Sequence, residues 1–167
     1  MLTLNRHTDD GGWEYREAWF DEEAGEFVVH HGTVGRNGTI TAETAGAEQA
    51  EGLVESFRAQ CAADGFAEPD PAELIRLEVV YPLKGATPGA AEERNVTQVH
   101  TAALTWLAWR GLGALQDPEQ AARDGSQAMV MALDTLHRRK ATETVAAAVR
   151  STDVQPTRIR VARRPQG

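Results

Sequence analysis

The sequence lacks several features that define large classes of proteins. Its single cysteine, Cys61, rules out an internal disulfide and fits a reducing cytoplasm. No apolar run approaches the roughly 18 residues that a membrane-spanning helix requires, and residues 1–10 lack the apolar core of a signal peptide. Aromatic residues make up 6%, and neither a collagen-like repeat nor a low-complexity tract is present. We therefore expect a cytoplasmic protein without a membrane segment.

Basic residues are scarce in the first part of the chain. Residues 1–70 contain fifteen acidic and four basic residues, a net charge of −11, whereas residues 71–167 contain ten acidic and thirteen basic residues, a net charge of +3. The change of sign falls at Pro69-Asp70-Pro71, where two prolines favour extended backbone and cannot continue a helix. The sequence thus predicts two small domains, residues 1–68 and residues 72–167, in a chain with an overall charge of −8.

The first domain reads as strands followed by one helix. Alternation of Trp13, Tyr15 and Trp19 with less apolar residues predicts a half-buried strand, and 26–31 predicts a second. Asn37-Gly38 predicts a turn into a third strand that begins at Thr39. From Ala47 the period changes to that of an amphipathic helix, which stops at Asp64-Gly65. The apolar face of this helix contains Ala50, Leu53, Val54, Phe57 and Cys61. We expect an antiparallel sheet with one packed helix.

A glycine framework in this domain resembles that of a known family. The segment His31-Gly32-Thr33-Val34-Gly35, then Asn37-Gly38, a strand, a helix and Gly65-Phe66 is similar to the WGR domain. That family is named for a Trp-Gly-Arg triplet that opens a W-G-R-V-G-x-x-G segment, and its helix typically ends in Gly-Tyr. The resemblance covers residues 10–67. The matching positions are Gly32, Val34, Gly35, Gly38, Phe57 and Gly65.

Two positions depart from the family pattern. The family's Trp falls on His31 and its Arg falls on Thr33. WGR domains in poly(ADP-ribose) polymerases use that Trp and its basic neighbours against nucleic acid, because stacking needs an aromatic face and phosphate binding needs positive charge. His31 and Arg36 are what remain here, on a domain with a charge of −11. The resemblance implies the fold, and nucleic-acid binding by this domain is disfavoured.

The second domain alternates strand and helix patterns and resembles no family. Alternating apolar residues predict a strand over 74–81, and Asn95 is expected to cap a helix that ends at Gly111. Asp117-Pro118 predicts a short helix that ends near Asp124-Gly125. The remaining predicted elements are a central strand over 126–133, a helix over 138–151 and a strand over 157–162. The predicted fold class is α+β, with a WGR-like domain followed by a small βαβ-type, ferredoxin-like domain.

Residues that carry chemistry are few and scattered. His30 and His31 are adjacent in a strand and so point to opposite faces, which prevents a shared metal ion. The glycines at 32, 35 and 38 open a strand, whereas a phosphate-binding loop opens a helix. Cys61 lies on the apolar helix face as a buried thiol. We therefore predict no catalytic residue, metal or cofactor. An enzyme with an unrecognised site remains an alternative that requires a deep polar pocket at His100 or His137.

These observations leave two further hypotheses. The first is a non-catalytic interaction protein whose WGR-like sheet engages a protein partner or a second copy of the chain. Its candidate binding residues are His31, Arg36, Trp106 and Trp109. The alternative is a nucleic-acid-binding protein, connected with the DNA-damage response by the family resemblance, that uses the C-terminal arginines Arg158 and Arg160. High Ala, Arg and Gly usage indicates a bacterial source with GC-rich codons.

Overall fold

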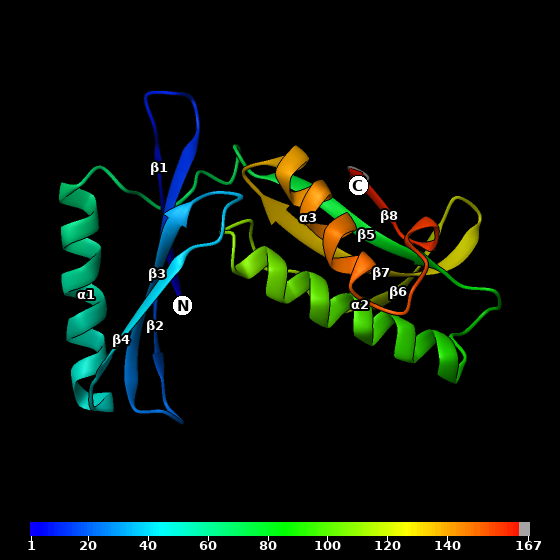
Figure 1. Cartoon of the computed structure of the whole chain (residues 1–167), viewed down its shortest axis with the longest axis horizontal. Coiled ribbons are helices and arrows are strands. Elements are labelled where there is room, and N and C mark those ends of the chain that lie inside the picture. Colours follow the sequence, from blue (N-terminus) through cyan, green and yellow to red (C-terminus); the bar gives the residue numbers. More distant parts are fainter. Residues whose placement is uncertain (164–167) are drawn as a thin grey trace. The chain divides into compact units, whose positions relative to one another are not determined.

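A computed structural model describes residues 1–163 and divides the chain into two compact units, Met1–Glu73 and Leu74–Gly167 (Figure 1). The Pro69-Asp70-Pro71 segment belongs to the first unit. We describe each unit by itself. None of the helices within residues 1–163 is long and apolar enough to cross a membrane.

The N-terminal unit is an antiparallel meander with one helix beside it. Its elements are β1 (Leu2–His7), β2 (Trp13–Asp21), β3 (Glu26–Thr33), β4 (Thr39–Thr44) and α1 (Ala47–Ala63). The strands pair in the order β1-β2-β3-β4, and α1 lies along one face of this sheet (Figure 1). The predicted α+β class, an antiparallel sheet with a packed helix, is confirmed for this unit.

The apolar face of α1 is buried against the sheet, as its periodicity predicts. Cys61 packs with Leu2, Leu4 and Phe66, while Val54 and Phe57 lie against the same cluster. The Phe57 ring meets the Phe27 ring of β3 at 72°, with 6.3 Å between centroids. Edge-to-face aromatic contacts of this kind contribute beyond the area that they bury. This packing fixes α1 and the turn that follows it over the β1–β2 end of the sheet.

Two details of this unit differ from expectation. Strand β1 was not predicted, although Leu2 and Leu4 alternate with polar residues and are both buried. The turn between β3 and β4 is centred on Val34-Gly35 and not on Asn37-Gly38. The Arg36 amide donates to the Thr33 carbonyl at 3.0 Å, and Gly35 has a φ of 87°, which favours glycine. Gly38 lies close to the Tyr15 hydroxyl, which leaves no room for a side chain at this position.

The C-terminal unit has the element order βαββαβ. Its elements are β5 (Ile75–Pro82), α2 (Ala90–Ala108), β6 (Glu119–Arg123), β7 (Ser126–Thr135), α3 (Arg138–Arg150), the 3-10 turn η1 (Pro156–Arg158) and β8 (Arg160–Arg163). The strands pair antiparallel in the order β6-β7-β5-β8. Helices α2 and α3 pack together on one face of this sheet (Figure 1). This arrangement is the ferredoxin-like split βαβ topology.

The short helix expected from Asp117-Pro118 is wrong, because residues 119–123 form strand β6. Arg123 pairs with Ser126 across a two-residue loop, in which Asp124 and Gly125 have φ values of 52° and 79°. Two successive positive φ values are typical of a type I′ hairpin, for which Asp-Gly is a favoured sequence. The backbone hydrogen bonds between β6 and β7 therefore outweigh the local preference of Asp117-Pro118 for a helix start.

The predicted start of the long helix is also wrong. Helix α2 begins at Ala90, and the Glu92 carboxylate accepts a hydrogen bond from the Gly89 amide at 3.2 Å. Asn95 lies inside the helix, where its side-chain amide donates to the Tyr81 hydroxyl at 3.0 Å. The last strand begins at Arg160 and not at Thr157, because the 3-10 turn Pro156–Arg158 precedes it.

Candidate functional site

His31 lies at one end of the N-terminal sheet, on the face that α1 covers. The register places Arg16 of β2 opposite His31 of β3, and Glu14 opposite both Thr33 of β3 and Arg6 of β1. Directly paired residues share a sheet face. Five polar side chains from three strands are therefore gathered beside the C-terminal end of α1.

The turn after α1 completes this cluster. Arg16 Nη1 donates to Asp64 Oδ2 at 2.5 Å, and Arg6 Nη1 donates to the Asp64 carbonyl at 2.8 Å. The two guanidinium groups also contact the Phe66 ring, at 4.2 Å for Arg16 and 4.6 Å for Arg6. Cation–π contacts of this kind hold a guanidinium plane in place without using its donors.

These residues line a pocket of about 220 Å³, which we call the arginine pocket. Its lining includes Arg6, Glu14, Arg16, His31, Thr33 and Phe66. The hydrogen bond from Arg16 lowers the pKa of Asp64, and Arg6 Nη2 is 2.6 Å from Glu14 Oε2. Arg6 and Arg16 are thus oriented by carboxylates, while their side chains remain 40% and 29% exposed. The pocket offers fixed hydrogen-bond donors with little net charge.

A second polar cluster lies on the opposite face of the same sheet. Tyr15 Oη is 2.9 Å from His30 Nε2, and His30 Nδ1 is 3.0 Å from Glu17 Oε2. The Thr3 hydroxyl donates to Glu17 Oε1 at 3.4 Å. Tyr15, His30 and Glu17 are all buried. A hydroxyl, an imidazole and a carboxylate in this order can activate the hydroxyl as a nucleophile, and we call these three side chains the relay. The relay can react only if a substrate reaches the Tyr15 hydroxyl.

The β3–β4 connection closes over this relay. A Cβ atom on Gly38 would lie 2.0 Å from Tyr15 Oη and 2.3 Å from His30 Nε2. Gly32 is also close, because its Cβ would lie 3.1 Å from the Gly38 Cα. Burial raises the pKa of Tyr15, and the charge of Glu17 raises it further. The hydroxyl is therefore both covered and held in its protonated form, which fits a structural network better than a nucleophile.

The two adjacent histidines have the opposite orientations that the strand pattern predicts. His30 is buried in the relay, whereas His31 is exposed beside the arginine pocket. No group of three or more His, Cys, Asp or Glu side chains within residues 1–163 is placed to hold a metal ion. Cys61 is buried in the core beneath α1, as expected, with its Sγ 3.7 Å from Arg16 Nη1.

The other predicted binding residues are dispersed. Arg36 is exposed in the β3–β4 connection, close in sequence to His31 but outside the pocket lining. Trp106 of α2 is half-buried and carries the Arg110 guanidinium 4.8 Å from its ring centroid. Trp109, just after α2, is 43% exposed. The two tryptophans belong to the C-terminal unit, and neither is among the residues that line the arginine pocket.

Arg158 and Arg160 are engaged inside the C-terminal unit. The Arg158 guanidinium lies 4.7 Å from the Tyr81 ring centroid, donates to the Pro82 carbonyl at 3.3 Å and is 3.7 Å from Glu92 Oε1. Arg160 Nη1 is 2.6 Å from Asp124 Oδ2. Both arginines therefore help to hold loops on the sheet. Arg164, the last member of the predicted basic cluster, lies outside the described residues.

His100 and His137 line neither the arginine pocket nor the larger pocket described below. His100 Nε2 is buried without a hydrogen bond and lies 3.9 Å from Asp117 Oδ1. His137 precedes α3, and burial lowers the pKa of its imidazole, with the charge of Lys140 adding to the effect. Neither of these two pockets therefore brings His100 or His137 together with a nucleophilic side chain.

Sequence reasoning found His31 but missed the groups around it. Arg6 and Arg16 occupy ordinary strand positions, and Phe66 was noted only as part of the glycine framework. The contacts that join them to the turn after α1 span 58 and 48 residues. The alternation of Glu14 and Arg16 with the aromatic residues of β2 was the available signal. It indicates a strand but does not indicate a pocket.

Comparison of the chain with models of protein families, with characterised proteins and with solved structures finds no match. The likeness to the WGR domain therefore rests on the glycine framework of the sequence.

Proposed function

We propose that the chain is a non-catalytic, cytoplasmic interaction protein, and that its WGR-like N-terminal unit binds a carboxylate side chain of a protein partner in the arginine pocket. The observation that carries the proposal is the pair of oriented guanidinium groups beside the exposed His31. Arg16 uses Nη1 for its hydrogen bonds to Asp64 and Cys61, which leaves its other N–H groups for a ligand. Guanidinium groups match carboxylates in a bidentate geometry.

The size and charge of the pocket favour one side chain over a polymer. A volume of about 220 Å³ accommodates a single Glu or Asp side chain. Glu14 and Asp64 offset the charges of Arg6 and Arg16, and the first 70 residues carry a net charge of −11. Long-range attraction for a nucleic-acid backbone is therefore weak, whereas short-range hydrogen bonds to one carboxylate remain available. Thr33 lines the same pocket and supports a wider contact, and a role for Arg36 stays a prediction.

The alternatives have less support. Arg158 and Arg160, the predicted nucleic-acid contacts, are paired with Glu92 and Asp124. An enzymatic role would need access to the Tyr15–His30–Glu17 relay, which lies beneath Gly38. A role for Trp106 and Trp109 in a second contact of the same partner stays a prediction.

The test is an NMR titration of the full chain with N-acetyl-glutamate amide, using N-acetyl-glutamine amide as the uncharged control. We expect saturable shifts of the Gly32, Thr33 and Phe66 amides with the carboxylate compound only. Arg16→Gln should weaken this binding about tenfold, the loss of one charge-assisted contact. The matched control Arg58→Gln makes the same change in charge away from the pocket and should bind like the natural chain.

Three results would contradict the proposal. Equal shifts with both compounds, or retained affinity in Arg16→Gln, would remove the pocket as a carboxylate site. Shifts of the same amides with protein concentration alone would indicate that the pocket contacts a second copy. Duplex DNA binding that weakens between about 50 and 200 mM salt, and that is lost in Arg158→Ala/Arg160→Ala, would favour the nucleic-acid hypothesis.

A further inference from the structure

The outer strand of the N-terminal sheet has only part of its free edge covered. Strand β1 is at the edge of the order β1-β2-β3-β4. On its outer side, Asn5 exchanges two backbone hydrogen bonds with Ala67, of 2.7 and 2.9 Å, in an antiparallel bridge. The segment that leaves the turn after α1 therefore begins to form a fifth strand.

Proline stops this fifth strand after one residue pair. In an antiparallel ladder, outward-facing backbone groups recur at every second residue, so the next position on β1 is Thr3, which faces residue 69. Residue 69 is proline and has no N–H to donate to the Thr3 carbonyl. Within residues 1–163, the only bridge on the outer side of β1 is that between Asn5 and Ala67. Thr3 thus keeps one donor and one acceptor on an open edge.

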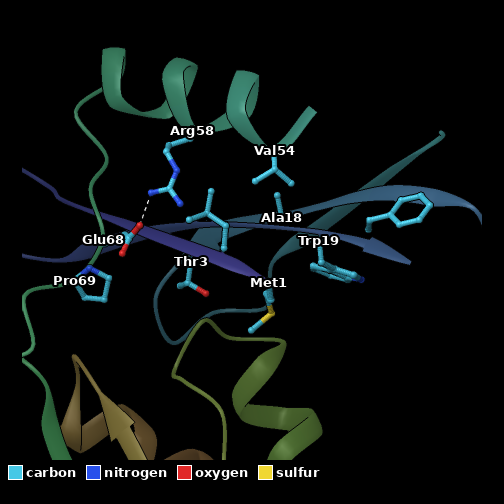
Figure 2. A pocket seen from close by; sticks show the side chains of 10 residues that line it. Met1, Thr3, Ala18, Trp19, Val54, Arg58, Glu68 and Pro69 are labelled. Atoms are coloured by element: carbon cyan, nitrogen blue, oxygen red, sulfur yellow. Dashed lines mark hydrogen bonds and ion pairs between the residues drawn. The ribbon is translucent and has the colours of Figure 1, made fainter. Parts of the chain in front are cut away.

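A pocket of about 630 Å³ adjoins this open position, and we call it the edge pocket (Figure 2). Figure 2 shows Thr3 on β1 with Met1 just before the strand, Val54 and Arg58 on α1, and Glu68 and Pro69 on the departing segment. Arg58 and Glu68 form an ion pair across one side of the pocket, and both side chains are more than half exposed. The remaining lining residues are Leu2, Ala18, Trp19 and Phe20.

We propose that the edge pocket is a docking site for an extended peptide segment of a partner protein, which adds to β1 as a strand at Thr3 and continues the pairing that Pro69 ends. A backbone N–H and C=O side by side on a sheet edge are matched by the backbone of another strand. The pocket beside them has a mixed polar and apolar lining, and its apolar part accepts side chains from one face of that strand, since alternate residues point the same way.

Charge identifies the class of peptide. Residues 1–70 carry a net charge of −11, and Glu68 lies at the mouth of the pocket. A segment that alternates apolar and basic residues satisfies both the lining and this field. A second copy of the chain is disfavoured as the occupant because it would bring the same acidic unit against this one. The edge pocket shares no lining residue with the arginine pocket, so each proposal can fail while the other holds.

The experiment measures binding of a fluorescein-labelled peptide of alternating lysine and valine to the full chain by anisotropy, together with hydrogen exchange of the Thr3 amide by NMR. We expect saturable binding and at least about tenfold slower exchange at Thr3 in the bound state, since a new backbone hydrogen bond protects that amide. The corresponding glutamate–valine peptide should not bind. Arg16→Gln should leave the lysine–valine affinity unchanged, which distinguishes this site from the arginine pocket.

Two variants isolate the strand pairing. Thr3→Pro removes the N–H that the guest strand needs and should weaken binding about tenfold or more. Thr3→Val loses the hydroxyl contact with Glu17 but keeps the N–H, and should bind like the natural chain. If Thr3→Pro disturbs folding, a lysine–valine peptide with alternate N-methyl groups gives the same test from the ligand side, and it should not bind.

The proposal is overturned by any of three results. These are no binding of the lysine–valine peptide, binding without protection of the Thr3 amide, or equal affinity of the N-methylated peptide. Protection of Thr3 that grows with protein concentration in the absence of peptide would assign the edge to a second copy and would also overturn it.

Discussion

The two units organise their charged and polar side chains in opposite ways. In the N-terminal unit, Tyr15, His30 and Glu17 form one continuous buried chain, and Arg6 and Arg16 share a single phenylalanine ring. In the C-terminal unit, the arginines are distributed over different carboxylates. Within the described residues, the pairs are Arg123 with Glu78, Arg158 with Glu92, Arg160 with Asp124, Arg139 with Glu143 and Arg76 with Asp134.

This difference shows why the net charge of a domain is a poor guide to its binding surface. The unit with the acidic total holds a pocket in which two guanidinium groups converge. The more basic unit has its best-placed arginines engaged within its own fold. What matters for a ligand is how many donors converge and remain accessible.

The largest effect is expected from breaking the connected network of the N-terminal unit. Gly38→Ala places a Cβ atom 2.0 Å from Tyr15 Oη, so either the connection or the relay must move. We expect a loss of about 3 kcal/mol in the stability of this unit, the upper range for overpacking. Hydrogen exchange followed by mass spectrometry should show faster exchange in β1–β3 and little change in β5 and β7.

The matched control for Gly38 is Gly52 in α1, where an added Cβ meets nothing within 4 Å. Gly52→Ala should stabilise the unit by about 0.5–1 kcal/mol, because alanine is the better helix former. If hydrogen exchange in β1–β3 of Gly38→Ala is as slow as in the natural chain, the β3–β4 connection does not close over the relay.

A smaller effect is expected from a buried ion pair in the C-terminal unit. Glu78 is 3% exposed and accepts hydrogen bonds of 2.8 and 2.7 Å from Arg123. Glu78→Gln keeps the shape but removes the charge, and we expect a loss of about 2 kcal/mol. The loss should appear in urea unfolding and should be confined to faster exchange in the C-terminal unit.

Glu143→Gln is the control for this pair, because Arg139 and Glu143 are mostly exposed on α3. It should cost less than about 0.5 kcal/mol. Equal losses in the two variants would mean that burial does not set the strength of the Arg123–Glu78 pair. If Glu78→Gln also speeds hydrogen exchange in the N-terminal unit, the Arg123–Glu78 pair does not stabilise the C-terminal unit alone.

The elements predicted well from sequence are those with a sustained local period. Helix α1 and helix α3 have one apolar face over several turns, and β7 is a long apolar run. Strand β1 is six residues long and has no turn signal before it, so its alternation went unnoticed. At Asp124-Gly125 two local signals competed, a helix stop and a hairpin turn, and only the pairing of β6 with β7 decides between them.

The candidate sites depend on contacts that local patterns do not encode. His31 stood out because a family position could be compared with it, whereas Arg6, Arg16 and Phe66 converge only after α1 has returned the chain to the sheet. The role of Gly38 was misassigned for a related reason. Its sequence context indicates a turn, but the nearby Tyr15 hydroxyl excludes a side chain there. Pro69, which ends the pairing on β1, was read only as a linker residue.

The smallest effect concerns pH and distinguishes the buried relay from the accessible pocket on the other face. Burial and Glu17 raise the pKa of Tyr15 in the folded state. A group with a raised folded pKa contributes stability that is present below its unfolded pKa, about 10 for tyrosine, and is lost as the pH rises further. The N-terminal unit should therefore become easier to unfold in urea above a pH of about 10.

Tyr15→Phe should be less stable than the natural chain at neutral pH, because His30 Nε2 loses its contact with the Tyr15 hydroxyl. The loss of stability with rising pH should be less steep in this variant. An unchanged alkaline slope in Tyr15→Phe would mean that the hydroxyl reaches water and that Gly38 leaves the relay open, which would return Tyr15 to consideration as a reactive group.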